Sequence, residues 1–153
     1  MPSEVELVSK VVEYEGFFRL ESVRFRHEQF AGGMTPVLNR EVISHSDIVA
    51  VLPYDERLDR VVLIEQFRVG AHIAGEPGWL YETVAGLIEP SESPEAAAAR
   101  ETYEEIGTEA VELERIGTYF LAPHQSPDRM HLFLGKVDSE HASARVRRQH
   151  DRA

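Results

Sequence analysis

The sequence predicts an α+β fold built around a mixed β-sheet. Segments rich in β-branched and aromatic residues come first, one strongly helical segment follows, and two more strand-like segments come after it. Strands grouped on either side of one helix, rather than a regular alternation of strands and helices, are typical of this fold class. The length of 153 residues, 42% of them hydrophobic, suits one compact domain or one domain with a small sheet attached.

The strands are expected in two groups. The first group, in residues 1–46, should form a small N-terminal antiparallel sheet with strands at 5–15, 17–27 and 37–45, separated by Gly16 and by Gly32 and Gly33. The second group begins with a hairpin of buried strands at 47–54 and 60–67. A loop at 69–78, a short strand at 79–85 and a polar loop at 86–93 follow. After the helix, further strands are expected at 111–121 and 130–137.

Residues 94–106 form the clearest helical segment. Ser93 can cap the helix, Pro94 suits its first position and Gly107 can end it. On a helical wheel, a core stripe gathers at Ala96, Ala99, Tyr103 and Ile106.

Three glutamates, Glu101, Glu104 and Glu105, gather on the side of this helix opposite the predicted core stripe. Like charges three and four positions apart each cost an isolated helix about 0.2–0.5 kcal/mol. Two interpretations follow: the glutamates form a solvated acidic face, or they bind a hard divalent cation such as Mg²⁺ or Mn²⁺, which prefers oxygen ligands.

Composition excludes several other kinds of site. The chain has no cysteine, so disulfides, thiolate metal sites and a cysteine nucleophile are excluded. A net charge of −11 argues against nucleic-acid binding. The N-terminus lacks the pattern of a signal peptide, and no apolar run approaches the roughly 18–20 residues of a membrane helix. We therefore expect a cytoplasmic protein that contacts neither nucleic acid nor membrane.

The spacing around the glutamates resembles the Nudix box. Five residues separate Gly86 from Glu92, and seven more precede Arg100 and Glu101; Glu104, Glu105 and Gly107 then follow at the family's intervals. Threonine stands at positions 102 and 108, where the family usually has an aliphatic residue.

This resemblance implies a Nudix domain at 47–138, with an α/β/α sandwich and a mixed sheet. It implies that metal ions are bound by Glu101, Glu104, Glu105 and the backbone carbonyl of Ala85. Arg100 would complete the catalytic set and would form a buried ion pair with Glu92. Metal-activated water would cleave a diphosphate, with Glu101 or Glu104 as the general base.

Three further segments are similar to the bacterial ADP-ribose pyrophosphatase subgroup. They are residues 14–18 (YEGFF), 65–68 (EQFR) and 79–86 (WLYETVAG), and Pro123 lies sixteen residues after Gly107, as in that subgroup. The resemblance implies cleavage of ADP-ribose to AMP and ribose 5-phosphate in a homodimer with exchanged N-terminal sheets. It also implies that Phe17 stacks on adenine, that Arg40 and Arg68 bind the phosphates, and that Glu82 contacts ribose or adenine. Phe17 as a core residue and the arginines as surface residues are the alternatives.

Two departures leave the substrate open. Asp128 stands where the subgroup has a glutamate that touches the terminal ribose, and its side chain is one methylene shorter. Residues 139–153 are expected to form an irregular tail, without counterparts of the catalytic-loop glutamate and closing helix found in relatives, which suggests a truncated chain. The alternatives are therefore hydrolysis of a nucleoside diphosphate sugar such as GDP-mannose, or a catalytically silent nucleotide-binding module.

Overall fold

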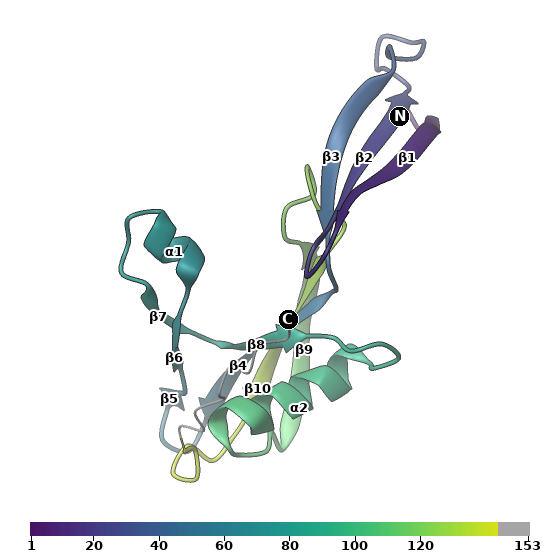
Figure 1. The fold of residues 1–153 in the computed structure, drawn as a ribbon. Coiled ribbons are helices and arrows are strands. Elements are labelled where there is room, and N and C mark those ends of the chain that lie inside the picture. The colour runs from purple at the N-terminus through teal and green to yellow at the C-terminus, as the bar shows by residue number, and fades with distance from the viewer. Residues whose placement is uncertain (144–153) are drawn as a thin grey trace. The chain divides into compact units, whose positions relative to one another are not determined.

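The computed structural model describes residues 1–143, and these residues form two compact units (Figure 1). The N-terminal unit contains residues 1–45 and 120–128, and the second unit contains residues 46–119 and 129–143. The tail predicted for 139–153 lies outside the described residues from position 144 onward. No helix within the described part of the chain has the length and apolar character needed to span a bilayer.

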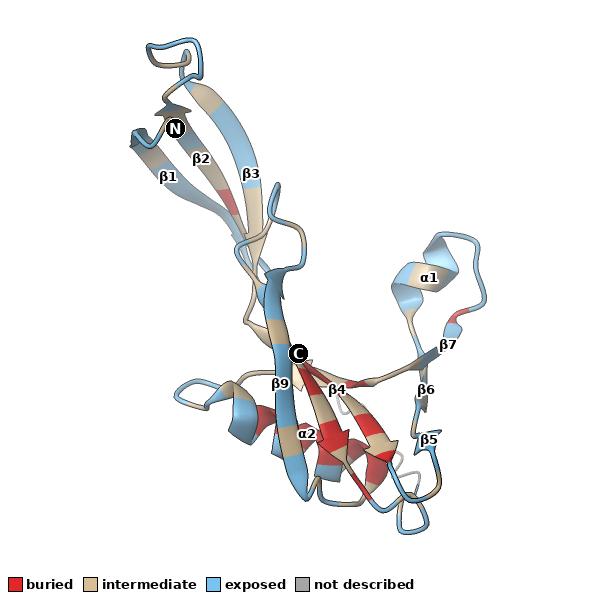
Figure 2. Cartoon of the chain, turned by 180° about the vertical axis from the view of Figure 1, so that it is seen from behind, coloured by how far each residue is buried: buried red, intermediate tan, exposed pale blue. Residues whose placement is uncertain are grey.

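The N-terminal unit is built on a three-stranded antiparallel sheet. Its strands are β1 (Val5–Glu15), β2 (Arg19–His27) and β3 (Leu38–Ser44), in the order β1-β2-β3, as predicted to within two residues. Figure 2 shows these strands as largely exposed. The one buried position of the sheet is Glu21, whose carboxylate binds the Lys10 ammonium at 2.7 Å and the Arg19 guanidinium at 3.0 Å.

The second unit is built on a five-stranded mixed sheet. Its strands are β4 (Ile48–Asp55), β5 (Arg60–Val61), β8 (Val84–Leu87), β9 (Glu112–Phe120) and β10 (Arg129–Lys136). The order is β5-β4-β10-β9, and β8 also pairs with β4. Strand β10 runs parallel to β4, whereas β5 and β8 run antiparallel to it, so the sheet is mixed as predicted.

The structure differs from the prediction in three segments of the second unit, namely two strands and one loop. The segments 60–67 and 79–85 do not form continuous strands, because each changes its pairing partner midway. The second half of the first segment, β6 (Ile64–Phe67), and the first half of the second segment, β7 (Trp79–Glu82), pair with each other as a hairpin. The remaining halves, β5 and β8, pair with β4. The expected loop at 69–78 contains a short helix, α1 (Val69–Ile73).

The long helix α2 (Pro94–Ile106) has the predicted bounds, and the predicted local signals set them. The Ser93 hydroxyl accepts a hydrogen bond from the Ala96 amide at 3.1 Å, and Pro94 occupies the first turn. Gly107 ends the helix in the left-handed region, with φ 75°, and its amide donates to the Tyr103 carbonyl at 3.0 Å. This helix supplies one helical layer of the expected sandwich within residues 1–143.

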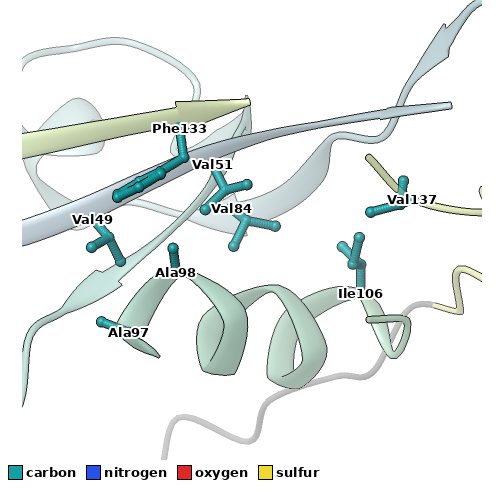
Figure 3. Packing of buried hydrophobic residues seen from close by; sticks show 8 residues of the cluster. All are labelled: Val49, Val51, Val84, Ala97, Ala98, Ile106, Phe133 and Val137. Carbon is teal, nitrogen blue, oxygen red and sulfur yellow. The ribbon is translucent and has the colours of Figure 1, made fainter. Parts of the chain in front are cut away.

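The core of the second unit lies between α2 and the sheet. Figure 3 shows Val51, Val84 and Phe133 above the helix, with Ala98 directed at them. The other members of the cluster are Val49, Ala97, Ile106 and Val137.

The predicted core stripe was wrong at three of its four positions. Of the stripe, only Ile106 is buried; Ala96, Ala99 and Tyr103 are exposed. The buried face instead carries Ala97, Ala98, Glu101, Thr102, Glu105 and Ile106. Small alanines allow α2 to lie close to the sheet, and the hydroxyl of the fully buried Thr102 donates to the Ala98 carbonyl at 2.7 Å, which satisfies its hydrogen-bonding need.

Asp55 fastens the end of β4 to the segment that follows β10. Its carboxylate accepts hydrogen bonds from the Ser139 hydroxyl at 2.7 Å and the Ser139 amide at 3.0 Å. It also accepts from the amides of Arg57 and Leu58. The bonds from Ser139 are the main cause that lowers the pKa of Asp55 to about 2.

Candidate functional site

The glutamates of α2 form a largely buried acidic cluster in the second unit. Glu101 is 2% exposed and Glu105 is 6% exposed, while the side chain of Glu104 is 36% exposed. Two of the three predicted site acids thus lie on the face of α2 that packs toward the sheet, and the simple solvated-face interpretation is excluded for them. Burying carboxylates is costly unless donors or cations compensate.

Arg100 is the cation that compensates part of this charge. Its Nε and Nη2 atoms donate to the two carboxylate oxygens of Glu92 at 2.9 and 2.8 Å, and Nη2 also donates to the Leu87 carbonyl at 3.0 Å. Its Nη1 atom donates to Glu101 Oε1 at 2.6 Å and lies 3.6 Å from Glu104 Oε2. The predicted ion pair of Glu92 and Arg100 is therefore confirmed. Their side chains are 15% and 23% exposed, so the pair is partly rather than fully buried.

This pairing changes the protonation chemistry of both partners. The hydrogen bonds from Arg100 are the main cause that lowers the pKa of Glu92 to about 2, and the Glu89 amide adds to the effect. The pKa of Arg100 is raised, first by its bonds to Glu92 and then by those to Glu101. Both side chains are therefore charged at neutral pH and fix the loop before α2 to the helix.

Gly86 allows Glu101 to lie against β8. A Cβ atom at position 86 would collide with the Glu101 carboxylate, so a side chain there would displace the acid. The glycine at the start of the predicted motif is thus explained by close approach of a carboxylate to the backbone. The adjacent residue, Ala85, donates its amide to Glu105 Oε2 at 3.2 Å, which places the backbone of β8 beside a second acid.

Gln66 completes the environment of Glu105. Its side-chain Nε2 atom donates to Glu105 Oε1 at 3.0 Å. Burial raises the pKa of Glu105, the hydrogen bonds from Ala85 and Gln66 oppose this rise, and the charge of Glu101 adds to it. Sequence reasoning did not assign a role to Gln66, although it lies in the 65–68 segment that carries the subgroup resemblance.

The donor set of this cluster consists of oxygen atoms and fits a hard divalent cation. A cation would offset the repulsion between Glu101 and Glu105 that contributes to the raised pKa of Glu105. Within residues 1–143, however, no three acidic or histidine side chains are already gathered closely enough to form a metal site. Arg100 binds the carboxylates of Glu101 and Glu104 in this structure.

Arg68 and Glu82, both predicted to contact substrate, contact each other in the second unit. The Arg68 Nε and Nη2 atoms donate to the Glu82 carboxylate, with the shortest distance, 2.7 Å, between Nη2 and Oε2. The hydrogen bond to Glu82 is the main cause that raises the pKa of Arg68, and the charge of Glu105 contributes. The pair thus lies within electrostatic range of the acidic cluster.

The other predicted substrate residues belong to the N-terminal unit. Phe17 is 57% exposed, so it is not a core residue, and the centroid of its ring lies 4.3 Å from that of the His45 ring. Arg40 is exposed, and its Nη1 atom donates to the Asn39 carbonyl at 2.7 Å. The Asp128 carboxylate accepts from the His45 amide at 3.1 Å and so holds the end of β3.

Comparison with known proteins gives consistent matches. The family model of the NUDIX domain matches residues 44–151. An ADP-ribose pyrophosphatase of Haemophilus influenzae is 39% identical over 142 residues, which cover 91% of this chain and 65% of that protein. An ADP-ribose pyrophosphatase of Escherichia coli (strain K12) is 38% identical over 141 residues, covering 92% and 68%. A GDP-mannose pyrophosphatase of Citrobacter koseri is 31% identical over 146 residues, covering 94% and 75%.

A solved structure resembles the chain in fold. It is the crystal structure of an ADP compounds hydrolase, with a TM-score of 0.69 and 23% identity, covering 88% of this chain and 68% of that chain. This chain spans about two thirds of the length of the ADP-ribose pyrophosphatases that it matches.

Proposed function

This chain belongs to the Nudix family, and we propose that it hydrolyses the diphosphate of ADP-ribose to AMP and ribose 5-phosphate. The observation that carries the proposal is the burial of Glu101 and Glu105 against Ala85 and Gly86, in a cluster that Arg100 only partly neutralises. The similarity to two ADP-ribose pyrophosphatases over more than nine tenths of the chain supports this substrate.

We propose that Glu101, Glu104, Glu105 and the Ala85 carbonyl hold Mg²⁺, or Mn²⁺ in its place. Carboxylate and carbonyl oxygens are the ligands that these ions prefer, and the Ala85 backbone lies beside Glu105. When bound, the divalent ion supplies charge neutralisation of the diphosphate and a lowered pKa for the attacking water.

The remaining roles follow from exposure. The water oxygen forms a bond to one phosphorus, the bond from that phosphorus to the bridging oxygen breaks, and the bridging oxygen leaves with the other phosphate. Among the three acids, Glu104 is the most exposed and is the proposed acceptor of the proton from water. Arg100 and Glu92 keep the loop and helix in place during this step.

Five residues are proposed to contact the substrate. Phe17, with its exposed ring, would stack on adenine, and Arg40 and Arg68 would bind the phosphates. A diphosphate would compete with Glu82 for the Arg68 guanidinium, which would leave the Glu82 carboxylate to bind a ribose hydroxyl or adenine. Asp128 would contact the terminal ribose.

We also propose a homodimer in which N-terminal sheets are exchanged. Strand β1 leaves apolar side chains exposed, including Val5, Leu7 and Val11, and a partner would bury them. Light scattering should give a mass of twice 17.3 kDa, and a monomeric mass across a wide concentration range would contradict the exchange.

The function is tested by incubating the protein with ADP-ribose and Mg²⁺ in ¹⁸O-labelled water. We expect AMP and ribose 5-phosphate by mass spectrometry, with one label in one of the two products, and no products in the presence of a chelator. GDP-mannose is the competing substrate, because a relative named GDP-mannose pyrophosphatase is 31% identical. Faster turnover of GDP-mannose would overturn the choice of ADP-ribose, and no turnover of either substrate would support a silent nucleotide-binding module.

A further inference from the structure

Gln66 lies on a hairpin whose two faces differ. In the register of β6 and β7, Phe67 pairs with Trp79, and these residues, together with Tyr81, are exposed. Gln66 pairs with Leu80, and both are half-buried. The alternation of strand side chains therefore turns the Gln66 amide to the less exposed face of the hairpin, where it reaches Glu105 of α2.

The Glu105 carboxylate is held at both of its oxygens. Oε1 accepts from Gln66 Nε2 at 3.0 Å and Oε2 accepts from the Ala85 amide at 3.2 Å. A carboxylate has about four acceptor positions, so the two donors fix its plane and leave other positions open. The donors come from different elements, the hairpin and β8, so neither one alone sets the orientation.

We propose that Gln66 is a positioning residue that fixes the Glu105 carboxylate in the orientation in which it binds a divalent cation. The inference rests on the metal site proposed above and adds a residue to it. Without the Gln66 amide, Glu105 would be held through one oxygen only, and the terminal torsion of a glutamate is broad and weakly restricted. Residues that orient metal ligands typically change metal affinity or activity by about 10- to 100-fold when replaced.

A purely structural role for Gln66 makes a different prediction. If the amide only docked the hairpin on α2, its loss would lower thermal stability without a specific effect on metal binding. The readout must therefore be metal affinity in the absence of substrate, with thermal stability measured alongside.

The experiment measures Mn²⁺ binding to the full chain by electron paramagnetic resonance of the free ion. Gln66→Met keeps the length of the side chain and removes its donor, and Glu65→Met is the matched control on the exposed face of the same strand. We expect the Mn²⁺ Kd to rise about 10- to 100-fold for Gln66→Met and to stay at the wild-type value for Glu65→Met. Glu105→Gln should weaken binding at least as much as Gln66→Met.

The outcomes separate the two proposals. If Glu105→Gln leaves Mn²⁺ binding unchanged, the metal site itself is wrong and the role of Gln66 falls with it. If Glu105→Gln weakens binding and a folded Gln66→Met binds like wild type, only the role of Gln66 is overturned. Equal weakening by Glu65→Met would also overturn it. Should Gln66→Met not fold, Gln66→Asn replaces it: its amide is one methylene short, so a wild-type Kd would contradict the proposal.

Discussion

Replacing Arg100 by methionine tests the electrostatic arrangement of the site through stability. The substitution removes four hydrogen bonds from the guanidinium: two to Glu92, one to Glu101 and one to the Leu87 carbonyl. Exposed ion pairs contribute about 0–1 kcal/mol, and breaking a buried pair costs about 3–5 kcal/mol. With Arg100 and Glu92 at 23% and 15% exposure, we expect a loss of about 2–4 kcal/mol.

Urea unfolding of the metal-free protein, followed by circular dichroism, measures this loss. Thermal unfolding is a second measurement of the same loss. At about 3 °C per kcal/mol for a chain of this length, the Tm should fall by roughly 6–12 °C. Arg60→Met is the control, because Arg60 is exposed on β5 and its replacement changes the net charge equally; it should alter stability by less than about 0.5 kcal/mol. Arg100→Lys should recover little, since lysine lacks the fork that binds both Glu92 oxygens. A loss below about 1 kcal/mol for Arg100→Met would refute this account.

Three further predictions concern the same unit. Glu105→Gln should lower Mg²⁺-dependent turnover of ADP-ribose by about 100-fold or more, since several kcal/mol of charge stabilisation are lost. Because burial already raises the pKa of Glu105 and so disfavours its charge, the metal-free Tm, measured by scanning fluorimetry, should not fall. Gly86→Ala places a methyl group against a carboxylate of α2 and should cost about 1–3 kcal/mol in urea unfolding, whereas Gly117→Ala, where the methyl meets open space, should cost little. Asp55 and Glu92 have pKa values of about 2 in the folded protein, below their ordinary values, so the stability that they contribute is present above pH of about 4.5 and lost as pH falls toward about 2. Urea midpoints across this range should show that loss, and Asp55→Asn should make it shallower; a parallel curve would contradict the assignment.

Local signals explain why the bounds of α2 could be predicted. Ser93, Pro94 and Gly107 act through hydrogen bonds and torsions of their own neighbourhood, which a sequence displays directly. The resemblance to the Nudix box likewise implied the ion pair of Arg100 with Glu92, and the structure contains it.

The buried face of α2 could not be predicted in the same way. A helical wheel assigns the core to apolar residues, so it placed Glu101 and Glu105 away from the sheet. Their burial depends on Arg100 of the same helix and on donors from two other elements, the Ala85 amide of β8 and the Gln66 amide of β6. Tertiary donors of this kind leave no periodic pattern in the sequence.

The hairpin of β6 and β7 illustrates a second limit. Aliphatic, β-branched and aromatic residues continue from β5 into β6, and from β7 into β8, so each pair reads as one strand. The change of partner is visible only in the register, where Val61 pairs with Tyr54 of β4 while Phe67 pairs with Trp79 of β7. Helix α1 is too short for its periodicity to distinguish it from a loop.

The two acids on the core-facing side of α2 limit how much stability this protein can gain by mutation without losing its proposed chemistry. Ionisable groups held among Ala97, Ala98 and Ile106 keep the metal-free fold below the stability that apolar residues would give it there. Selection for heat resistance alone would therefore favour replacements of Glu105, whose charge burial already disfavours, and these would abolish the proposed chemistry. Engineering of a more robust variant should hold these two positions fixed and look for gains on the exposed face of the helix, at residues such as Ala99 and Tyr103.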